Sequence, residues 1–471
     1  MSKQKITAKE LRAIGFPQSP VIPLALDAVA KHYKHEGREV IDAQLQKVLE
    51  NPAGYLDDEI FAAVAKKLMP VPEDEMIKLT EPVDFSIYGG GNIEPGALEQ
   101  MQIAAQLPVA AAGALMPDAH QGYGLPIGGV LATRNAVIPY GVGVDIGCRM
   151  CLSIYDIAPE HFEANRNQYK RDLIANSLFG AGNGFKGDAM TDHEILENEL
   201  FRKNQLLKSL HEKARVQLGS SGGGNHFVEY GYLEMKQTDP QLNVPEGKYL
   251  ALLTHSGSRG LGATIANHYT RLAKELCQLP GHAANLAYLD LNSEAGMEYW
   301  MAMTLAGDYA SACHHVIHDK MARALGAQVL ARVENHHNYA WKELWNGEEV
   351  IVHRKGATPA GEGVLGIIPG SMTAPGYLVR GKGMVASLNS ASHGAGRQMS
   401  RTKASAAITR QGLKQVLREA GVELIGGGTD EAPLAYKDIN MVMAAQQDLV
   451  DILAKFSPKM VRMADDGSRE D

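Results

Sequence analysis

The feature that most constrains this fold is a set of Cys and His residues that lie far apart in the chain. Each is embedded in a short segment rich in Gly or Asn: VDIGC (144–148), GNHFVE (224–229), THSGSRGLG (254–262), NHHN (335–338) and SHGAGR (392–397). Together they supply a thiolate, carboxylates and several imidazoles, which are donors that transition metals prefer. If they form one composite metal site, the fold must bring all five segments together.

The composition is that of an ordinary soluble protein. The chain has 471 residues, 45% of them hydrophobic, and a mean hydropathy of −0.19. We expect one large domain with an appendage. No basic start precedes an apolar run, and no apolar stretch approaches the roughly 18 residues of a membrane span, so we expect neither a signal peptide nor a membrane contact. Four cysteines in such a chain favour a reducing, cytoplasmic location.

The net charge of −8 gives no general attraction to nucleic acid, so a polyanion must be met by local patches. Two basic clusters are candidates: Arg397, Arg401, Lys403, Arg410 and Lys414, and Arg354, Lys355, Arg380 and Lys382. On composition alone, each is better interpreted as a solvated face.

The expected fold class is α+β, a mixed sheet-layer catalytic domain with its active residues on loops, preceded by a small all-α module. Apolar periodicity predicts helices at 24–35, 39–50 and 57–69, and prolines and acidic residues place a boundary near 70–82. We therefore divide the chain into a helical module (1–80), a catalytic domain (83–463) and a polar tail (464–471). Within the domain, 294–325 and most of 430–456 are expected to be helical.

Asp145 and Cys148 lie in a tightly turned, nearly uncharged segment, where a buried carboxylate or thiolate is costly without a cationic partner. A divalent cation would satisfy both groups. Cys148 and Cys151 also match half of a zinc or redox pattern, but no second pair exists because Cys277 and Cys313 stand alone. We therefore expect Cys151 to be a small buried residue.

His226 follows three glycines, and Asn225 and Glu229 lie beside it, a combination suited to a metal, a phosphate or a purine. His255 ends an apolar strand and enters a turn with Arg259 that resembles an anion-binding nest. Either histidine alone would be interpreted as structural. Beside the other motifs, we interpret both as functional.

Adjacent imidazoles at His336 and His337 cannot easily serve one site, so we expect one ligand and one packing residue. His393 precedes Arg397 and Arg401, a setting that suits an imidazole attacking phosphorus; the alternative is a phosphate loop in which it only donates a hydrogen bond. Other histidines lack such context and are expected to be surface or packing residues: His32, His35, His211, His268, His282, His314, His315, His318 and His353.

Nine segments occur in this order: MPDAHQGYG (116–124), VGVDIGC (142–148), GNHFVE (224–229), HSGSRGLG (255–262), HN (337–338), RKGA (354–357), PGSM (369–372), SHGAGRQMSRTKA (392–404) and AYKDI (435–439). Together they closely resemble the RtcB-type RNA ligases, the family of the tRNA-splicing ligase. The resemblance runs from about residue 83 to 457, and residues 1–80 lie outside the usual family core.

The resemblance implies a GTP- and Mn²⁺-dependent ligase of RNA repair or tRNA processing, which joins an RNA 3′-phosphate or 2′,3′-cyclic phosphate to a 5′-hydroxyl. It implies two manganese sites that share Cys148: Asp145, Cys148 and His226, and Cys148, His255 and His337. His393 matches the histidine that becomes guanylylated. It implies these guanylate-binding positions: Asn225, Glu229, Lys355, Ser371, Tyr436 and His393. Arg149, Arg397 and Arg401 are the expected RNA contacts.

The same donors would accept Zn²⁺ or Co²⁺, so the sequence does not fix the metal. An archease-like activating protein is a further partner that the resemblance allows, and no DNA partner is expected.

The chain departs from the family pattern at three places. The family ends in Val-Lys-Gly, whose lysine reaches the guanine base; here Met463 stands near that position, and Lys459 or Arg462 could substitute. Gly376 stands where a second serine is expected. Arg149 replaces a small residue, and its guanidinium could bind an RNA phosphate or restrict access. These changes bear on guanine selectivity more than on the metals, and they indicate a divergent paralogue.

Three hypotheses follow from the sequence. The favoured one is an active RNA ligase. The second is a metal-dependent RNA phosphate-end processing enzyme with weak ligation, and the third is a non-catalytic RNA-end-binding protein recruited through its helical module. His393 and the full donor set favour catalysis, whereas the altered C-terminus keeps the second hypothesis open.

Overall fold

The structure is a computed structural model, and it describes residues 6–17, 21–69 and 76–465. Contacts within the chain divide it into two compact units, Met1–Met76 and Ile77–Asp471. Residues 70–75 of the expected linker and 466–471 of the expected polar tail lie outside the described residues. Among the helices of the described ranges, none is both long and apolar enough to cross a membrane.

The first unit is helical, as expected, and contains α1 (Ala8–Ala13), α2 (Val21–His32), α3 (Arg38–Glu50) and α4 (Ala62–Leu68). A capping box starts α1, because Thr7 Oγ1 accepts from the backbone N–H of Glu10 and the Glu10 carboxylate accepts from that of Thr7. The apolar faces of these helices pack on one another and form a core of their own.

The second unit contains two large sheets. The five-stranded sheet has the order β1 (Phe85–Ile87), β2 (Ala110–Tyr123), β3 (Leu125–Thr133), β11 (Glu348–Lys355) and β10 (Asn338–Trp345). The eight-stranded sheet runs β13 (Leu365–Ile368), β14 (Gly376–Gly381), β17 (Val450–Met463), β6 (Phe227–Met235), β7 (Gly247–Ser256), β5 (Arg149–Tyr155) and β9 (Val329–His336), with β16 (Glu423–Ile425) parallel to β17.

The eight-stranded sheet is a nearly closed barrel. Its two end strands meet, since the Asn335 side chain on β9 accepts from the backbone N–H of Ile367 on β13 at 2.8 Å and donates to its carbonyl at 3.3 Å. Met150, Leu253, Leu378 and other apolar side chains fill the inside. The α+β class is therefore confirmed, but the principal sheet curls on itself instead of forming an open layer.

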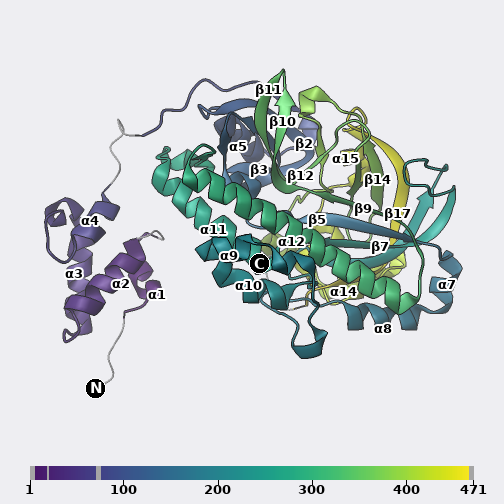
Figure 1. The fold of residues 1–471 in the computed structure, drawn as a ribbon, viewed down its shortest axis with the longest axis horizontal. Coiled ribbons are helices and arrows are strands. Elements are labelled where there is room, and N and C mark those ends of the chain that lie inside the picture. The colour runs from purple at the N-terminus through teal and green to yellow at the C-terminus, as the bar shows by residue number, and fades with distance from the viewer. Residues whose placement is uncertain (1–5, 18–20, 70–75, 466–471) are drawn as a thin grey trace. The chain divides into compact units, whose positions relative to one another are not determined.

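The long helices cover the outside of these sheets. They include α5 (Pro95–Ala105), α8 (Arg166–Asn176), α10 (Gln205–Gln217), α11 (Arg259–Leu276), α12 (Glu294–Leu325) and α14 (Arg410–Ala420). Helix α12 was expected at these bounds. Ser293 Oγ caps its N-terminus and Gly326, in the left-handed region at φ 58°, ends it. Figure 1 shows α12 running across β5 and β7, which it contacts.

The expectation that residues 430–456 are mostly helical is wrong. Only α15 (Ile439–Ala444) is an α-helix there, and from Val450 the chain forms β17, drawn in yellow in Figure 1. β17 pairs with β6 on one side and β14 on the other. Pairing on both edges decides its conformation, because side-chain packing in a central strand outweighs local helix preference.

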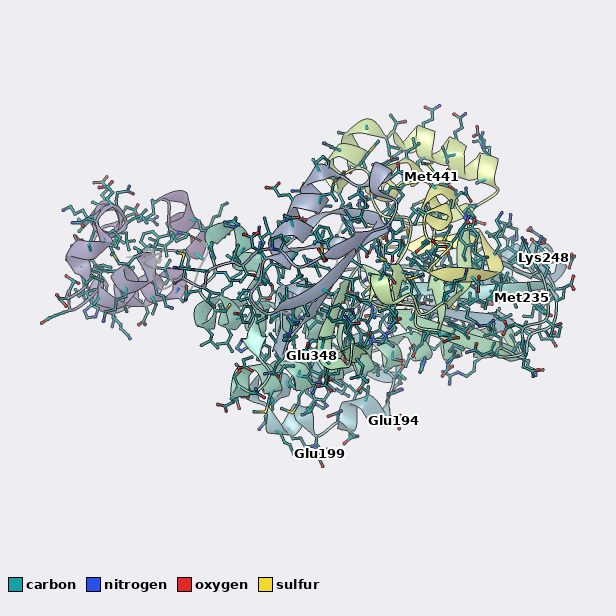
Figure 2. The ribbon with its side chains drawn as sticks, turned by 90° about the horizontal axis from the view of Figure 1, so that it is seen from above. Glu194, Glu199, Met235, Lys248, Glu348 and Met441 are labelled. Atoms are coloured by element: carbon teal, nitrogen blue, oxygen red, sulfur yellow. The ribbon has the colours of Figure 1, made fainter. Side chains whose placement is uncertain are left out.

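Strand parity gives β5 and β7 two chemically different faces. Met150 pairs with His255, and both side chains face the barrel interior, whereas Cys151 pairs with Thr254 on the face toward α12. The far end of the β6–β7 hairpin is remote from this chemistry; Figure 2 labels Met235 and Lys248 there. The pocket described next opens at the end where β5 begins and β7 ends.

Candidate metal and nucleotide site

A pocket of about 380 Å³ opens at this end of the barrel. It is lined by residues from both large sheets, by the loops that precede β5 and β6, and by the loops that follow β13 and β15 (Ser390–Ser392). Twelve of the residues singled out from the sequence line it: Asp145, Cys148, Asn225, Glu229, His255, His337, Lys355, Ser371, His393, Arg397, Arg401 and Tyr436.

Cys148 is the central residue of the predicted ligand set. Its Sγ lies 3.4 Å from His226 Nε2 and 3.2 Å from His255 Nε2, and His255 Nε2 lies 3.2 Å from His337 Nε2. Two groups of ligand atoms, each within 4.8 Å of one another, share this sulfur: Asp145, Cys148 and His226, and Cys148, His255 and His337. The fold thus brings together five donors spread over 193 positions of the sequence.

Backbone carbonyls hold two of these imidazoles by their outer nitrogens. His226 Nδ1 lies 2.8 Å from the carbonyl of Ser221, and His255 Nδ1 lies 3.2 Å from that of Asn225. When each Nδ1–H donates to its carbonyl, the Nε2 lone pair faces Cys148. Metal-binding histidines commonly have this arrangement, in which the outer hydrogen bond fixes both the tautomer and the ring.

The surroundings of the Asp145 carboxylate show whether the donors fit a cation. Its Oδ1 accepts from the backbone N–H of Ser258 at 3.0 Å, but its buried Oδ2 accepts no hydrogen bond from the described residues and lies 3.1 Å from His226 Nε2. A Cβ at Gly257 would come within 2.0 Å of that oxygen, so glycine allows the close approach. An unsatisfied carboxylate oxygen directed at a thiol and an imidazole is what a divalent cation would satisfy.

Two of the imidazoles are suited to this role because they are neutral. Burial lowers the pKa of His255 and of His337 well below the usual value, and the neighbouring imidazoles lower both further. No proton therefore competes for their lone pairs at physiological pH. The residues present fit a transition metal, because imidazole and thiolate donors suit ions such as Zn²⁺ and the Asp145 carboxylate suits Mn²⁺.

His393 lies beside the ligand set, because its ring centroid is 5.0 Å from that of His337. Its Nδ1 lies 2.6 Å from Oδ2 of Asp118, a fully buried residue of β2. No role was predicted for Asp118 from the sequence, although it lies in the segment MPDAHQGYG (116–124). A signal was present, because a lone Asp within the apolar run 110–119 needs a buried partner.

The far end of the pocket is more apolar. Glu229 faces it, and burial raises the pKa of this carboxyl well above its usual value. Val461 and Met463, paired in β17 with Glu229 and Phe227, complete the wall. Lys355 lies on the other side, donates to the carbonyls of Tyr123 and Tyr140, and has its pKa lowered by burial to about 7.

Arg397 and Arg401 reach the pocket but are held by acidic groups. Arg397 Nη1 lies 3.0 Å from Glu431 Oε2, and Arg401 Nη1 lies 3.0 Å from Asp430 Oδ2 and also pairs with Glu431. The Tyr436 hydroxyl donates to the same Glu431 carboxylate. Two expected RNA contacts therefore lie within an internal ion-pair network. Their acidic partners were not predicted from the sequence.

Three candidates lie away from the pocket. Arg149 is buried against α12, where it donates to the carbonyls of Gly147 and Gly307 and pairs with Glu334 at 3.4 Å. The guanidinium of Arg462 donates to the carbonyls of residues 173, 174 and 177 on the outer face of β17.

Lys459 lies over the ring of Tyr232 and is also absent from the pocket lining. Neither Lys459 nor Arg462 therefore replaces a lysine near Met463. His336 packs on Tyr339 and Trp341, whereas its neighbour His337 joins the ligand set.

A nearly closed barrel thus places a cluster of potential metal ligands beside His393 in one pocket. Comparison with known proteins gives the family. A family model described as tRNA-splicing ligase RtcB matches residues 100–464. The chain therefore belongs to the RtcB family and is an RNA ligase by that membership.

Among its relatives, the RNA-splicing ligase RtcB of Escherichia coli K12 is 35% identical over 396 residues, covering 77% of this chain and 93% of the relative. The tRNA-splicing ligase RtcB of Archaeoglobus fulgidus is 30% identical, with 77% and 88% covered. That of Nanoarchaeum equitans is 29% identical, with 74% and 87% covered. The helices of the first unit precede the matched residues.

Proposed function

We propose that this chain is a GTP- and Mn²⁺-dependent ligase that joins RNA 3′-phosphate or 2′,3′-cyclic phosphate ends to 5′-hydroxyl ends through a guanylylated His393. The observation that carries the proposal is the placement of His393, held at Nδ1 by Asp118, in the same pocket as two donor groups that share Cys148 and next to His337. Family membership supplies the RNA substrate class.

His393 is arranged as a nucleophile. When Nδ1–H donates to Asp118, the lone pair of Nε2 is free to attack the α-phosphorus of GTP. The N–P bond forms as the bond from the α-phosphorus to the bridging oxygen breaks, and pyrophosphate leaves with the electron pair. The Asp118 carboxylate stabilises the positive charge that develops on the ring.

The guanylate then passes to RNA. An oxygen of the RNA 3′-phosphate attacks the phosphorus, the N–P bond breaks, and His393 regains its lone pair. The 5′-hydroxyl attacks the activated 3′-phosphate, loses its proton, and displaces GMP; a cyclic end is first opened by water. Two divalent cations on the shared Cys148 would neutralise phosphate charge and polarise the phosphorus.

The other pocket residues are assigned by their chemistry. Lys355, when charged, pairs with phosphate oxygens, and Tyr436 offers a ring on which a base can stack. Glu229 can accept hydrogen bonds from a purine edge. Arg397 and Arg401 would exchange their internal carboxylate partners for RNA phosphates. Both the old and the new contacts are charge-assisted hydrogen bonds from a guanidinium to an anion.

The test is a guanylylation assay with Mn²⁺, α-labelled GTP and ATP as competitor. A covalent label that depends on His393 and that GTP alone supplies is the expected result. Absence of label from a protein that holds its pocket metals would favour the phosphate-end processing enzyme, which the apolar wall at Met463 makes the second candidate. Labelling by ATP would mean that the altered end of β17 has changed the nucleotide.

A further inference from the structure

A second group of metal-ligating side chains lies on the other side of β5 and β7 from the pocket. Cys151, His314 and His318 are all buried, and each offers one ligand atom within 4.8 Å of the others. None of the three lines the pocket. The cluster is therefore not part of the site described above. From the sequence, Cys151 was expected to be a small buried residue and the two histidines were expected to be surface or packing residues.

The topology builds this cluster from two elements. His314 and His318 are four residues apart on α12, so both side chains leave the same face of the helix. Cys151 lies on β5 directly opposite Thr254 of β7, and that face of the two strands packs under α12. Two histidines at this spacing on one helix face can bind the same divalent cation, and cysteine is a further zinc ligand.

The hydrogen bonds orient one nitrogen of each ring inward. His314 Nε2 lies 3.1 Å from the carbonyl of Ser256, and His318 Nδ1 lies 2.7 Å from Ser153 Oγ, so the outer nitrogens are fixed. The inner nitrogens, His314 Nδ1 and His318 Nε2, converge on Thr254 Oγ1 at 2.6 and 2.9 Å. Such partners on the outer nitrogen are common at metal-bound histidines, and Thr254 Oγ1 would be the nearest fourth donor to a cation held by the inner nitrogens.

The protonation states suit a cation. Burial lowers the pKa of His314 to about 3 and that of His318 well below its usual value, so both rings are neutral at physiological pH. Burial raises the pKa of the Cys151 thiol, so the sulfur keeps its proton until a cation displaces it.

We propose that Cys151, His314 and His318 form a second, structural metal site that binds one divalent cation of the Zn²⁺ class. On binding, the Cys151 S–H bond breaks, the sulfur keeps the electron pair as it coordinates the cation, and one proton passes to solvent. The two inner nitrogens coordinate the cation in place of their hydrogen bonds with Thr254.

The site would stiffen the wall of the pocket. Thr254 and Ser256 flank His255 on β7, and they face the second cluster while His255 faces Cys148. A cation there would connect α12 to β5, on the face of β7 opposite to the His255 side chain. The proposal does not depend on the ligase chemistry, since it concerns only the content of metal.

The full chain is unfolded, refolded with Zn²⁺, treated with a chelator and then exchanged into Mn²⁺. The Zn²⁺ that remains bound per chain is then measured. Because the cluster is fully buried, we expect one Zn²⁺ per chain to survive chelation. Cys151→Ser and His318→Gln should each lose it. Cys277→Ser, which removes a buried cysteine outside both clusters, should keep it.

Cys148→Ala separates this proposal from the pocket metals. That variant should still refold with one Zn²⁺, and its Co²⁺ form should show a thiolate-to-metal absorption band that disappears in Cys148→Ala/Cys151→Ser. If refolded wild type holds no chelator-resistant Zn²⁺, and Cys148→Ala holds none at all, the proposal is wrong and the cluster is a His–Thr–His hydrogen-bond network. These counts decide the matter even if a ligand variant fails to fold.

Discussion

Oδ2 of Asp118 lies 2.6 Å from Nδ1 of His393, although 275 positions separate the two residues in the sequence. Asp118 is fully buried on β2, and the same oxygen also accepts from the backbone N–H of Gly394 at 3.3 Å. The carboxylate therefore fixes both the ring and the start of the loop that carries it. This directs the Nε2 edge of His393 toward the pocket.

Asp118→Asn should slow formation of the His393 adduct by about 10²–10⁴-fold, because an amide can hold the wrong tautomer of the imidazole. Metal content should not change, since Asp118 belongs to neither donor group that shares Cys148. Single-turnover labelling with GTP measures the rate, and metal analysis of the same sample is the control. A rate within about threefold of wild type would exclude a positioning role.

His393→Ala should keep the pocket metals and form no covalent guanylate. The side chain lines the same pocket but is not a member of either donor group. Acid-labile labelling after incubation with Mn²⁺ and GTP is the measurement. An adduct that persists in this variant would move the nucleophile to another residue.

Cys148→Ala should lose both pocket metals, because its sulfur belongs to both donor groups. Removing Asp145 instead should weaken one group only, so Asp145→Ala is the matched comparison. Equilibrium binding of Mn²⁺ per chain distinguishes the two variants. Two tightly bound Mn²⁺ in Cys148→Ala would contradict a bridging thiolate.

The sequence was most informative where residues of metal-ligating type lie in glycine-rich segments. Cys148, His226 and His255 were grouped from residue type and local context, and the fold does bring them together. Asp118 was missed because its partner is 275 positions away, and no local pattern identifies a buried hydrogen bond over that separation. Arg149 was expected beside RNA, but it is the first residue of β5, and strand parity turns it toward α12.

Other features depended on tertiary contacts. The stretch after Val450 has apolar spacing that fits either a helix or a strand, and pairing on both edges made it β17. The basic cluster at 397–401 looked free in sequence because Asp430 and Glu431, its partners, follow about thirty positions later. The spacing of His314 and His318 was visible, but Cys151 joins them only because α12 packs on β5.

Lys355 should make nucleotide binding depend on pH. Burial lowers the pKa of its ammonium group to about 7, so in the free enzyme it loses its charge as the pH rises through that value. A triphosphate oxygen beside Nζ favours the charged form and raises the pKa. Binding at about pH 8 should therefore take up a proton at Lys355, whereas binding well below pH 7 should not, and affinity should fall as the pH rises above 7.

Calorimetry in buffers of different ionisation enthalpy measures this proton uptake. Lys355→Arg is the matched control, because its guanidinium is charged throughout the range and takes up no proton. The difference between the two proteins removes the contribution of the nucleotide's own phosphates. Equal uptake in wild type and Lys355→Arg would mean that Lys355 stays charged in the free enzyme, and that its contacts with the carbonyls of Tyr123 and Tyr140 outweigh its burial.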